Sequence, residues 1–213
     1  MSSSASASAA PGPAATEAAP RRARRYEKGL DAEGTGIVVV HGMDDFVKMA
    51  VVRAAVYMGE KTFAYHQQFD GNDFAATHLL ASVRGEPAGC IRIRFFGDFA
   101  KMERLAVRRE FRNSRIAFEL VRAAVDLCRA KGYRKLYGHA SEEYLNFWLH
   151  FGFKVRDNGA PFELASWPLV EMVEDVEPFA DAVRIGDDPV RTIRPEGLWN
   201  QPCALERPST LAG

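Results

Sequence analysis

The feature that most constrains the fold is the order of sequence patterns across residues 101–153. Apolar residues in the middle of this stretch recur with the spacing of one helix face, and Gly132 supplies a helix stop. The stretch predicts five pieces in this order: a strand (102–107), an arginine-rich loop (108–115), a long amphipathic helix (114–131), a short strand (135–139) and a short helix (142–150). It ends in Phe151-Gly152-Phe153. This alternation predicts an α/β domain in which a polar loop opens the long helix.

Composition limits the class of protein. The 213 residues are 47% hydrophobic, which is enough for one substantial core. Lys and Arg together number 28, as do Asp and Glu, so no net charge recruits nucleic acid or a membrane surface. Cys90, Cys128 and Cys203 form no CxxC pair, which favours a reduced, cytoplasmic protein. No apolar run is long enough for a membrane span.

Three segments are expected along the chain. Residues 1–29 are rich in Ser, Ala, Pro and Arg and predict a disordered tail, although this bias also suits an organelle transit peptide. Residues 36–175 hold the folded domain. Residues 176–213 contain five prolines among scattered apolar residues, which favours a strap over the domain or an interface arm.

The remaining elements build a sheet around the central stretch. Asp44 is a plausible N-cap for a helix that runs to Tyr57. Further strands are predicted over residues 36–40, 74–83, 88–96, 153–156 and 169–173, with a turn over 84–87. The strands over 74–83, 88–96 and 101–107 should form an antiparallel meander.

The central stretch resembles the acyl-CoA-binding half of the GNAT superfamily of N-acyltransferases. In that superfamily the loop before the long helix reads R/Q-x-x-G-x-G/A, and its amides bind the cofactor pyrophosphate. Here Arg112 and Ala117 match, whereas Arg115 replaces the central glycine. The resemblance therefore implies cofactor binding by Arg112, Asn113, Ser114, Arg115, Ile116 and Ala117. The alternative is that Asn113 or Ser114 only caps the helix and the arginines are solvated.

The resemblance also implies catalytic roles. Glu103 on the central strand would be the general base, acting through water, and strand amides near Leu105 and Val107 would bind the thioester carbonyl. The family's acidic tyrosine is Trp148 here, and an indole cannot deliver a proton. Tyr144, four residues earlier on the same predicted helix face, is the best substitute. Alternatively, Glu103 is only ion-paired, Tyr144 belongs to the core, and the thiolate leaves unaided.

A second resemblance lies in the front half of the chain. Arg53, then Asp70 and Asp73, then the strand arginines Arg92 and Arg94, follow the order seen in acyl-homoserine-lactone synthases and their relatives. In that branch such residues shape the substrate side, so Arg53, Asp70 and Asp73 are predicted substrate residues. Turn formation is the alternative explanation for the two aspartates. An acyl carrier protein remains open as acyl donor.

These patterns lead to one expectation and two alternatives. We expect a GNAT-like α/β fold, with a mixed, mostly antiparallel sheet splayed between the 101 and 135 strands, that transfers acetyl from acetyl-CoA to a small-molecule or peptide amine. The alternatives are a longer-chain acyltransferase using acyl carrier protein, docked near Arg108, Arg109 and Arg112, and a catalytically idle CoA-binding sensor. A homodimer is possible, and no metal is predicted. The five histidines are expected to be packing or surface residues.

Overall fold

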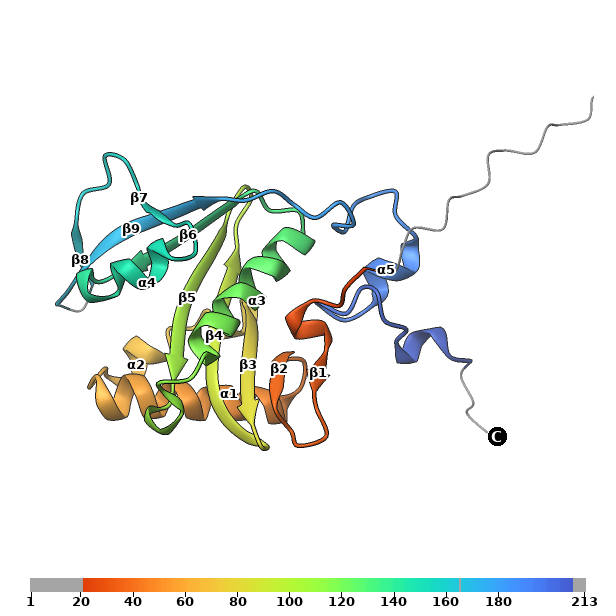
Figure 1. The fold of residues 1–213 in the computed structure, drawn as a ribbon, viewed down its shortest axis with the longest axis horizontal. Helices are drawn as coiled ribbons and strands as arrows, with labels where there is room; N and C mark the ends of the chain where they lie inside the picture. Colours follow the sequence, from red (N-terminus) through yellow and green to blue (C-terminus); the bar gives the residue numbers. More distant parts are fainter. Residues whose placement is uncertain (1–20, 165, 209–213) are drawn as a thin grey trace, which may run out of the picture.

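The computed structural model describes residues 21–164 and 166–208, and these form a nine-stranded sheet with helices on both faces (Figure 1). The strands lie in the order β1 (Gly29–Leu30), β2 (Gly36–Val39), β3 (Thr77–Val83), β4 (Glu86–Phe95), β5 (Ala100–Val107), β6 (Lys135–Ala140), β9 (Trp167–Asp175) and β7 (Lys154–Val155), and β8 (Phe162–Leu164) pairs with β9. Neighbouring strands are antiparallel except β5 and β6, which are parallel. The predicted mixed, mostly antiparallel sheet is confirmed.

Two helices cover opposite faces of the sheet. Along β4, Ile91 packs in the same core cluster as Leu120 of α3 (Ile116–Ala130), and Cys90 packs with Met49 of α1 (Met43–Arg53). Because successive side chains of a strand point to opposite faces, α1 and α3 lie on different sides. The other helical segments are η1 (Arg25–Glu27), η2 (Ala54–Glu60), α2 (Tyr65–Gln68), η3 (Asp73–Ala75), η4 (Arg109–Phe111), η5 (Glu142–Tyr144), α4 (Leu145–Leu149), α5 (Pro189–Ile193) and η6 (Ala204–Glu206).

Several predicted boundaries are shifted in the structure. The first helix begins at Met43 with Gly42 as N-cap, so the expected capping role of Asp44 is wrong, and the helix continues into the π-helical η2. The long helix begins at Ile116, because Asn113 adopts a left-handed conformation with φ of 62° that interrupts the helix before it. Strand β3 begins only at Thr77.

The N-terminal segment is folded from Arg21 onward. Tyr26 is only 1% exposed and lies in the main core, and Arg25 reaches Glu119 of α3. The expectation of disorder through residue 29 is therefore wrong for this part, because one aromatic anchor and several ion pairs hold a polar segment in place. Residues 1–20, the rest of that predicted tail, lie outside the described part of the chain.

The C-terminal segment, residues 176–208, returns over the end of α3 toward the N-terminal segment (Figure 1). The backbone N–H groups of Phe179 and Val183 donate to the carbonyls of Arg129 and Ala130 at the end of α3. Trp199 is 6% exposed in the main core, and Gln201 donates to the Glu27 carbonyl. The segment thus closes the core beside β2, as a strap would.

None of the helices in the described ranges combines the length and the apolar character that a membrane crossing demands.

Candidate functional site

The sheet opens between its two parallel strands. Residues 100–102 of β5 pair with residues 136–138 of β6, and the pairing stops there although β5 continues to Val107 and β6 to Ala140. Gly138 stands at the last pair, where a β-carbon would lie 3.2 Å from the Met102 carbonyl oxygen. Beyond this point the edge of β5 that faces β6 has no strand partner among residues 21–164 and 166–208. This opening is where we expected the sheet to splay.

A bulge in β5 lies at the mouth of this opening. Arg92 of β4 opposes Glu103, and Cys90 opposes Ala106, so β5 has one more residue than β4 between these pairs. Arg104 takes up the extra residue with φ of 55°. The Tyr57 hydroxyl donates to the Leu105 carbonyl oxygen at 2.8 Å and holds the bulge in place. The sequence shows no signal for this bulge, because Arg104 is neither Gly nor Asn.

The loop that follows β5 presents the start of α3 beside the opening. Arg112 donates to the Val107 carbonyl at 3.1 Å and pairs with Glu60 at 2.7 Å, which ties the loop to η2. Ser114 Oγ donates to the Phe111 carbonyl at 2.6 Å. The backbone N–H groups of residues 116–118 lie in the first turn of α3, where no helical carbonyl precedes them, and that of Ile116 donates to Ser114 Oγ over a long 3.4 Å. The predicted hexad 112–117 thus forms a helix N-terminus that can bind an anion.

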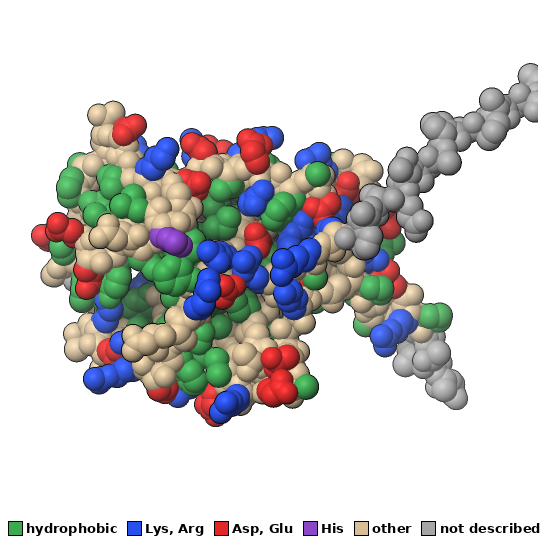
Figure 2. All heavy atoms as spheres, viewed as in Figure 1, with side chains coloured by type: hydrophobic (Ala, Val, Ile, Leu, Met, Phe, Trp, Pro, Cys, Tyr) green, Lys and Arg blue, Asp and Glu red, His purple; other side chains and the backbone are tan. Residues whose placement is uncertain are grey.

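Arg115 is the N-cap residue of α3 and is exposed. It takes part in none of the ion pairs formed within the described part of the chain. A cation at the positive end of a helix dipole is unfavourable on its own and becomes favourable when an anion lies beside it. Figure 2 shows Lys and Arg side chains gathered over α3 and the N-terminal segment. The exposed Arg115 guanidinium thus lies at the end of α3 where the helix dipole is positive.

A cluster of seven charged side chains, here called the ion cluster, lies on the opposite face, which α1 covers. Its members are Arg53, Asp70, Asp73, Arg92, Lys101, Glu103 and Arg104. Arg92 is the centre, because its guanidinium contacts Asp70 at 2.6 Å, Asp73 at 2.8 Å and Glu103 at 2.9 Å. Arg104 pairs with Asp70 at 3.0 Å, and Lys101 pairs with Glu103 at 3.2 Å.

The predicted substrate residues all belong to this cluster. Arg53 is fully buried, pairs with Asp73 and donates to the Gln68 carbonyl. Asp73 is also buried, whereas the side chain of Asp70 is 25% exposed. The structure therefore brings the three residues together, but their strongest contacts are with each other. Only Asp70 is open enough to meet a substrate in this conformation.

The cluster lowers the pKa of its aspartates. Burial alone would raise the pKa of Asp70, but hydrogen bonds from Arg92 and Arg104 outweigh it and hold the pKa well below its usual range. Burial likewise opposes ionisation of Asp73, and hydrogen bonds from Arg53 and Arg92 again lower its pKa. Both groups therefore stabilise the fold in their ionised form.

These shifts predict an acid-sensitive contribution to stability. A carboxyl whose pKa falls on folding adds stability above its unfolded pKa of about 3.9, and the gain is lost as pH falls below that value. We expect Asp70→Asn to lower the free energy of unfolding by about 2 kcal/mol at neutral pH, and this difference to shrink below about pH 4. Urea unfolding at a series of pH values measures it. A difference that stays constant down to about pH 2 would contradict the assigned role.

Tyr144 and Trp148 have different surroundings. It precedes α4, and its side chain is exposed, whereas Trp148 packs against Phe153 in the core. The expectation that both lie on one helix face is wrong, because Tyr144 ends the 3₁₀ turn η5. The Tyr144 hydroxyl accepts a hydrogen bond from Lys61 Nζ at 3.2 Å, and Lys61 also lies over the Trp167 ring. Its own O–H remains able to donate.

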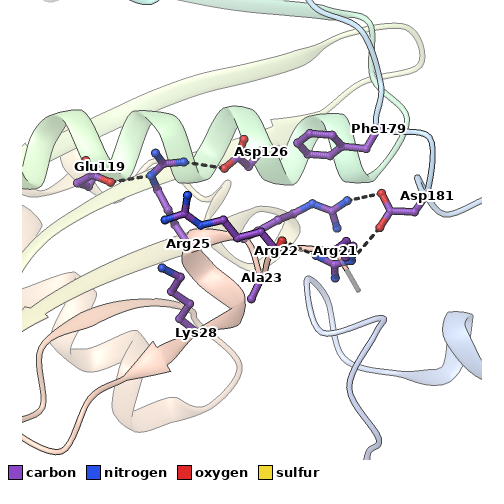
Figure 3. Close-up of a pocket in the computed structure, with 10 residues that line it drawn as sticks. Arg21, Arg22, Ala23, Arg25, Lys28, Glu119, Asp126, Phe179 and Asp181 are labelled. Atoms are coloured by element: carbon purple, nitrogen blue, oxygen red, sulfur yellow. Dashed lines mark hydrogen bonds and ion pairs between the residues drawn. The ribbon is translucent and has the colours of Figure 1, made fainter. Parts of the chain in front are cut away.

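A hollow of about 500 Å³ lies along α3 on the side of the N-terminal segment (Figure 3). Arg25 bridges Glu119 and Asp126 of α3, and Arg21 pairs with Asp181 of the C-terminal segment. The hollow is thus lined by ion pairs that link the N-terminal segment to α3 and to the C-terminal segment. It is separate from the opening between β5 and β6.

The described residues hold no group of three His, Cys, Asp or Glu side chains placed to bind a metal ion.

Comparison with known families decides the class. Residues 48–153 match the model of the GNAT acetyltransferase family. By this central domain, the chain belongs to the GNAT family. The matched residues include the opening, the bulge and the start of α3, so these features form an acyltransferase domain of a family that uses acyl-CoA. No curated protein matches the sequence significantly.

Solved structures with the same fold cover most of this GNAT protein. Escherichia coli ElaA is 19% identical over 66% of this chain and 99% of its own, with a TM-score of 0.59. A GNAT acetyltransferase from Elizabethkingia anophelis with acetyl-CoA bound is 15% identical over 66% and 98%, with a TM-score of 0.51. The CoA-dependent acyl-homoserine lactone synthase BjaI is 17% identical over 68% and 84%, with a TM-score of 0.57. At these identities the likeness concerns the fold, and it includes the synthase branch suggested by the front half of the sequence.

Proposed function

We propose that this GNAT protein transfers an acetyl group from acetyl-CoA to a primary amine by direct attack in a ternary complex. The observation that carries the proposal is the opening between β5 and β6, with the N-terminus of α3 beside it and the ion cluster on the face that α1 covers. A thioester held in the opening would be reached from that face. The donor and the acceptor would then meet at the bulge of β5.

The donor side is supported by two features. The N–H groups of residues 116–118 and the Arg115 guanidinium offer hydrogen bonds and positive charge for the pyrophosphate of CoA. The unpartnered edge of β5 offers backbone groups to the amides of pantetheine, as a neighbouring strand would. An acetyl-CoA molecule bound in this way carries its thioester toward Leu105 and Val107, whose amides are the candidate donors to the carbonyl oxygen.

The charge of the ion cluster supports binding of an amine acceptor on this face. The ion cluster contains four cations and three carboxylates, and Arg94 lies 3.9 Å from Glu103 at its border. Excess positive charge disfavours an ammonium ion relative to the neutral amine, and the neutral amine is the nucleophile. Glu103 remains a candidate base, although Arg92 and Lys101 already pair with it. Tyr144 remains the candidate acid for the leaving thiolate.

The loop after β5 favours CoA over acyl carrier protein as donor. A carrier protein is acidic and needs uncompensated positive charge at its docking surface. Of the three arginines suggested for docking, Arg108 pairs with Glu86 and Glu110, and Arg112 pairs with Glu60. Only Arg109 has no ion pair within the described residues.

The test is a turnover assay. Release of free thiol from acetyl-CoA is followed with a panel of primary amines, and the acetylated product is identified by mass spectrometry. We expect amine-dependent thiol release, and we expect Leu105→Pro, which removes one candidate N–H donor, to lower kcat by about 100-fold. Tight binding of acetyl-CoA without turnover across the panel would overturn the proposal in favour of a CoA-binding sensor.

A further inference from the structure

His139 stands on β6 directly across the opening from Glu103. The last parallel pair joins Met102 to Gly138, so Glu103 and His139 are the first residues beyond it. Lys101 and Tyr137 form the preceding pair on the same face, because side chains alternate along a strand. The imidazole therefore borders the gap in which the thioester would lie, on the face from which the acceptor would approach.

A chain of hydrogen bonds fixes the orientation of this imidazole. His139 Nε2 lies 2.9 Å from the Tyr137 hydroxyl oxygen. That hydroxyl donates to Glu171 of β9, and Arg156 holds the same carboxylate at 2.8 Å through its Nε. Because the Tyr137 proton is directed to Glu171, its oxygen is free to accept the proton of Nε2–H. The neutral ring then carries its lone pair on Nδ1, which has no hydrogen-bond partner among the described residues.

The surroundings keep the ring neutral. Burial, followed by repulsion from Lys101, lowers the pKa of His139 below its usual value, against the opposing charges of Glu171 and Glu103. The Phe162 ring of β8 packs edge-on against the imidazole with centroids 4.8 Å apart, and Tyr137 flanks it within the same strand. Arg156 is neutralised by Glu171. A neutral imidazole can accept a proton near neutral pH.

We propose that His139 Nδ1 is the general base of the acyl transfer, oriented by Tyr137 and Glu171, in place of the ion-paired Glu103. The inference rests on the proposed acyl transfer. The lone pair of the acceptor nitrogen forms the new C–N bond, and the C–S bond breaks with its electrons on sulfur. The proton lost by the attacking nitrogen goes to His139 Nδ1 and passes from there to the thiolate or to solvent.

Glu103 is less suited to this role because of its contacts. Arg92 Nε donates to it at 3.0 Å, and Lys101 Nζ lies 3.2 Å from its other oxygen. Both oxygens are therefore already engaged by cations. Glu103 then acts as a positioning residue that holds Arg92 and Lys101 at the edge of the opening.

The first test compares kinetics of matched variants. We expect His139→Gln to lower kcat by about 100-fold or more, with an unchanged Kd for acetyl-CoA by calorimetry, and exogenous imidazole to restore part of the rate. His41→Gln is the control. His41 lies on the β2 side of the sheet, and its ring is hydrogen-bonded to the Glu196 carbonyl, so this substitution should leave kcat unchanged. Glu103→Gln should lower kcat less than His139→Gln. The inference is wrong if the order of the two variants is reversed.

The pH dependence of kcat/KM distinguishes a catalytic role of His139 from a purely structural one. With one acceptor, the ratio of wild-type to His139→Gln kcat/KM cancels the titration of the acceptor itself. We expect this ratio to stay level down to about 6.5, the ordinary imidazole pKa, and to fall at lower pH, because the lowered pKa of His139 means that the imidazole becomes charged only there. Tyr137→Phe should lower kcat, but its kcat/KM should still show the fall at low pH. A ratio that is constant with pH would overturn the inference.

The second test needs no acceptor. Long-range ¹H–¹⁵N spectra of the wild-type protein should show His139 as the neutral Nε2–H tautomer at neutral pH. An Nδ1–H tautomer or an imidazolium would overturn the inference. Acetyl-CoA binding without turnover of any amine would overturn the proposed function. In that case the tautomer observed by NMR would still test whether Nδ1 of His139 is able to accept a proton.

Discussion

Arg92→Met should be the most damaging single substitution in the ion cluster, lowering the free energy of unfolding by about 3 kcal/mol or more. Arg92 is 1% exposed and binds three carboxylates, from the loop before β3 and from β5. Methionine fills a similar volume but leaves Asp70, Asp73 and Glu103 close together with less positive charge between them. Breaking a buried ion pair by removing one partner costs far more than losing a surface pair.

Urea unfolding followed by circular dichroism measures this loss. Arg94→Met is the matched control, because Arg94 is two residues along the same strand and its ion pair with Glu103, the one it forms in the described part of the chain, spans 3.9 Å. Its loss should stay below about 1 kcal/mol. Arg92→Lys should recover only part of the stability, since an ammonium cannot bind Asp70 in the two-pronged manner of a guanidinium. Equal losses for the two methionine variants would show that the cluster is not centred on Arg92.

Arg115→Glu should change stability and donor binding in opposite directions. At the N-cap of α3, glutamate complements the helix dipole, so the free energy of unfolding should rise by about 0.5 kcal/mol. The same change removes a charge-assisted hydrogen bond to the pyrophosphate and adds repulsion. We therefore expect acetyl-CoA to bind about 100-fold more weakly.

Calorimetric titration with acetyl-CoA and urea unfolding of the same preparations give the two quantities. Lys154→Glu, an equal change of charge on the exposed strand β7, serves as the control and should leave Kd unchanged. A solvated Arg115 with no role in binding would give the gain in stability with no loss of affinity. That outcome would remove the main argument for a phosphate site with arginine in place of glycine.

The fold of residues 101–153 could be predicted because its apolar patterns repeat over many residues. Fifteen residues of α3 repeat one apolar face, and β5 and β6 keep their alternation. The short strands β1 and β8 could not be found, since two or three residues carry no periodicity. The fold of Arg21–Glu27 was also missed, because its order depends on Tyr26 and on ion pairs with distant residues.

The candidate site divides in the same way. Glu103 lies within a strand and the hexad 112–117 lies at a helix start, so local sequence patterns could predict their positions. Arg53, Asp70 and Asp73 were identified as a group, but their mutual bonds depend on Arg92, which was singled out only as part of the family pattern. His139 was set aside as packing or surface. Its alternation with Tyr137 on one face of a strand was the available signal, but its place at the end of the β5–β6 pairing requires the sheet register.

The most direct test of the account is a crystal structure of the protein with acetyl-CoA. The account predicts the pyrophosphate at the N–H groups of residues 116–118 beside Arg115, with pantetheine along the free edge of β5. The thioester should lie in the opening between β5 and β6, with Glu103 and His139 on the acceptor side. Acetyl-CoA bound elsewhere, or an opening filled by this chain's own side chains in the complex, would contradict the central claim.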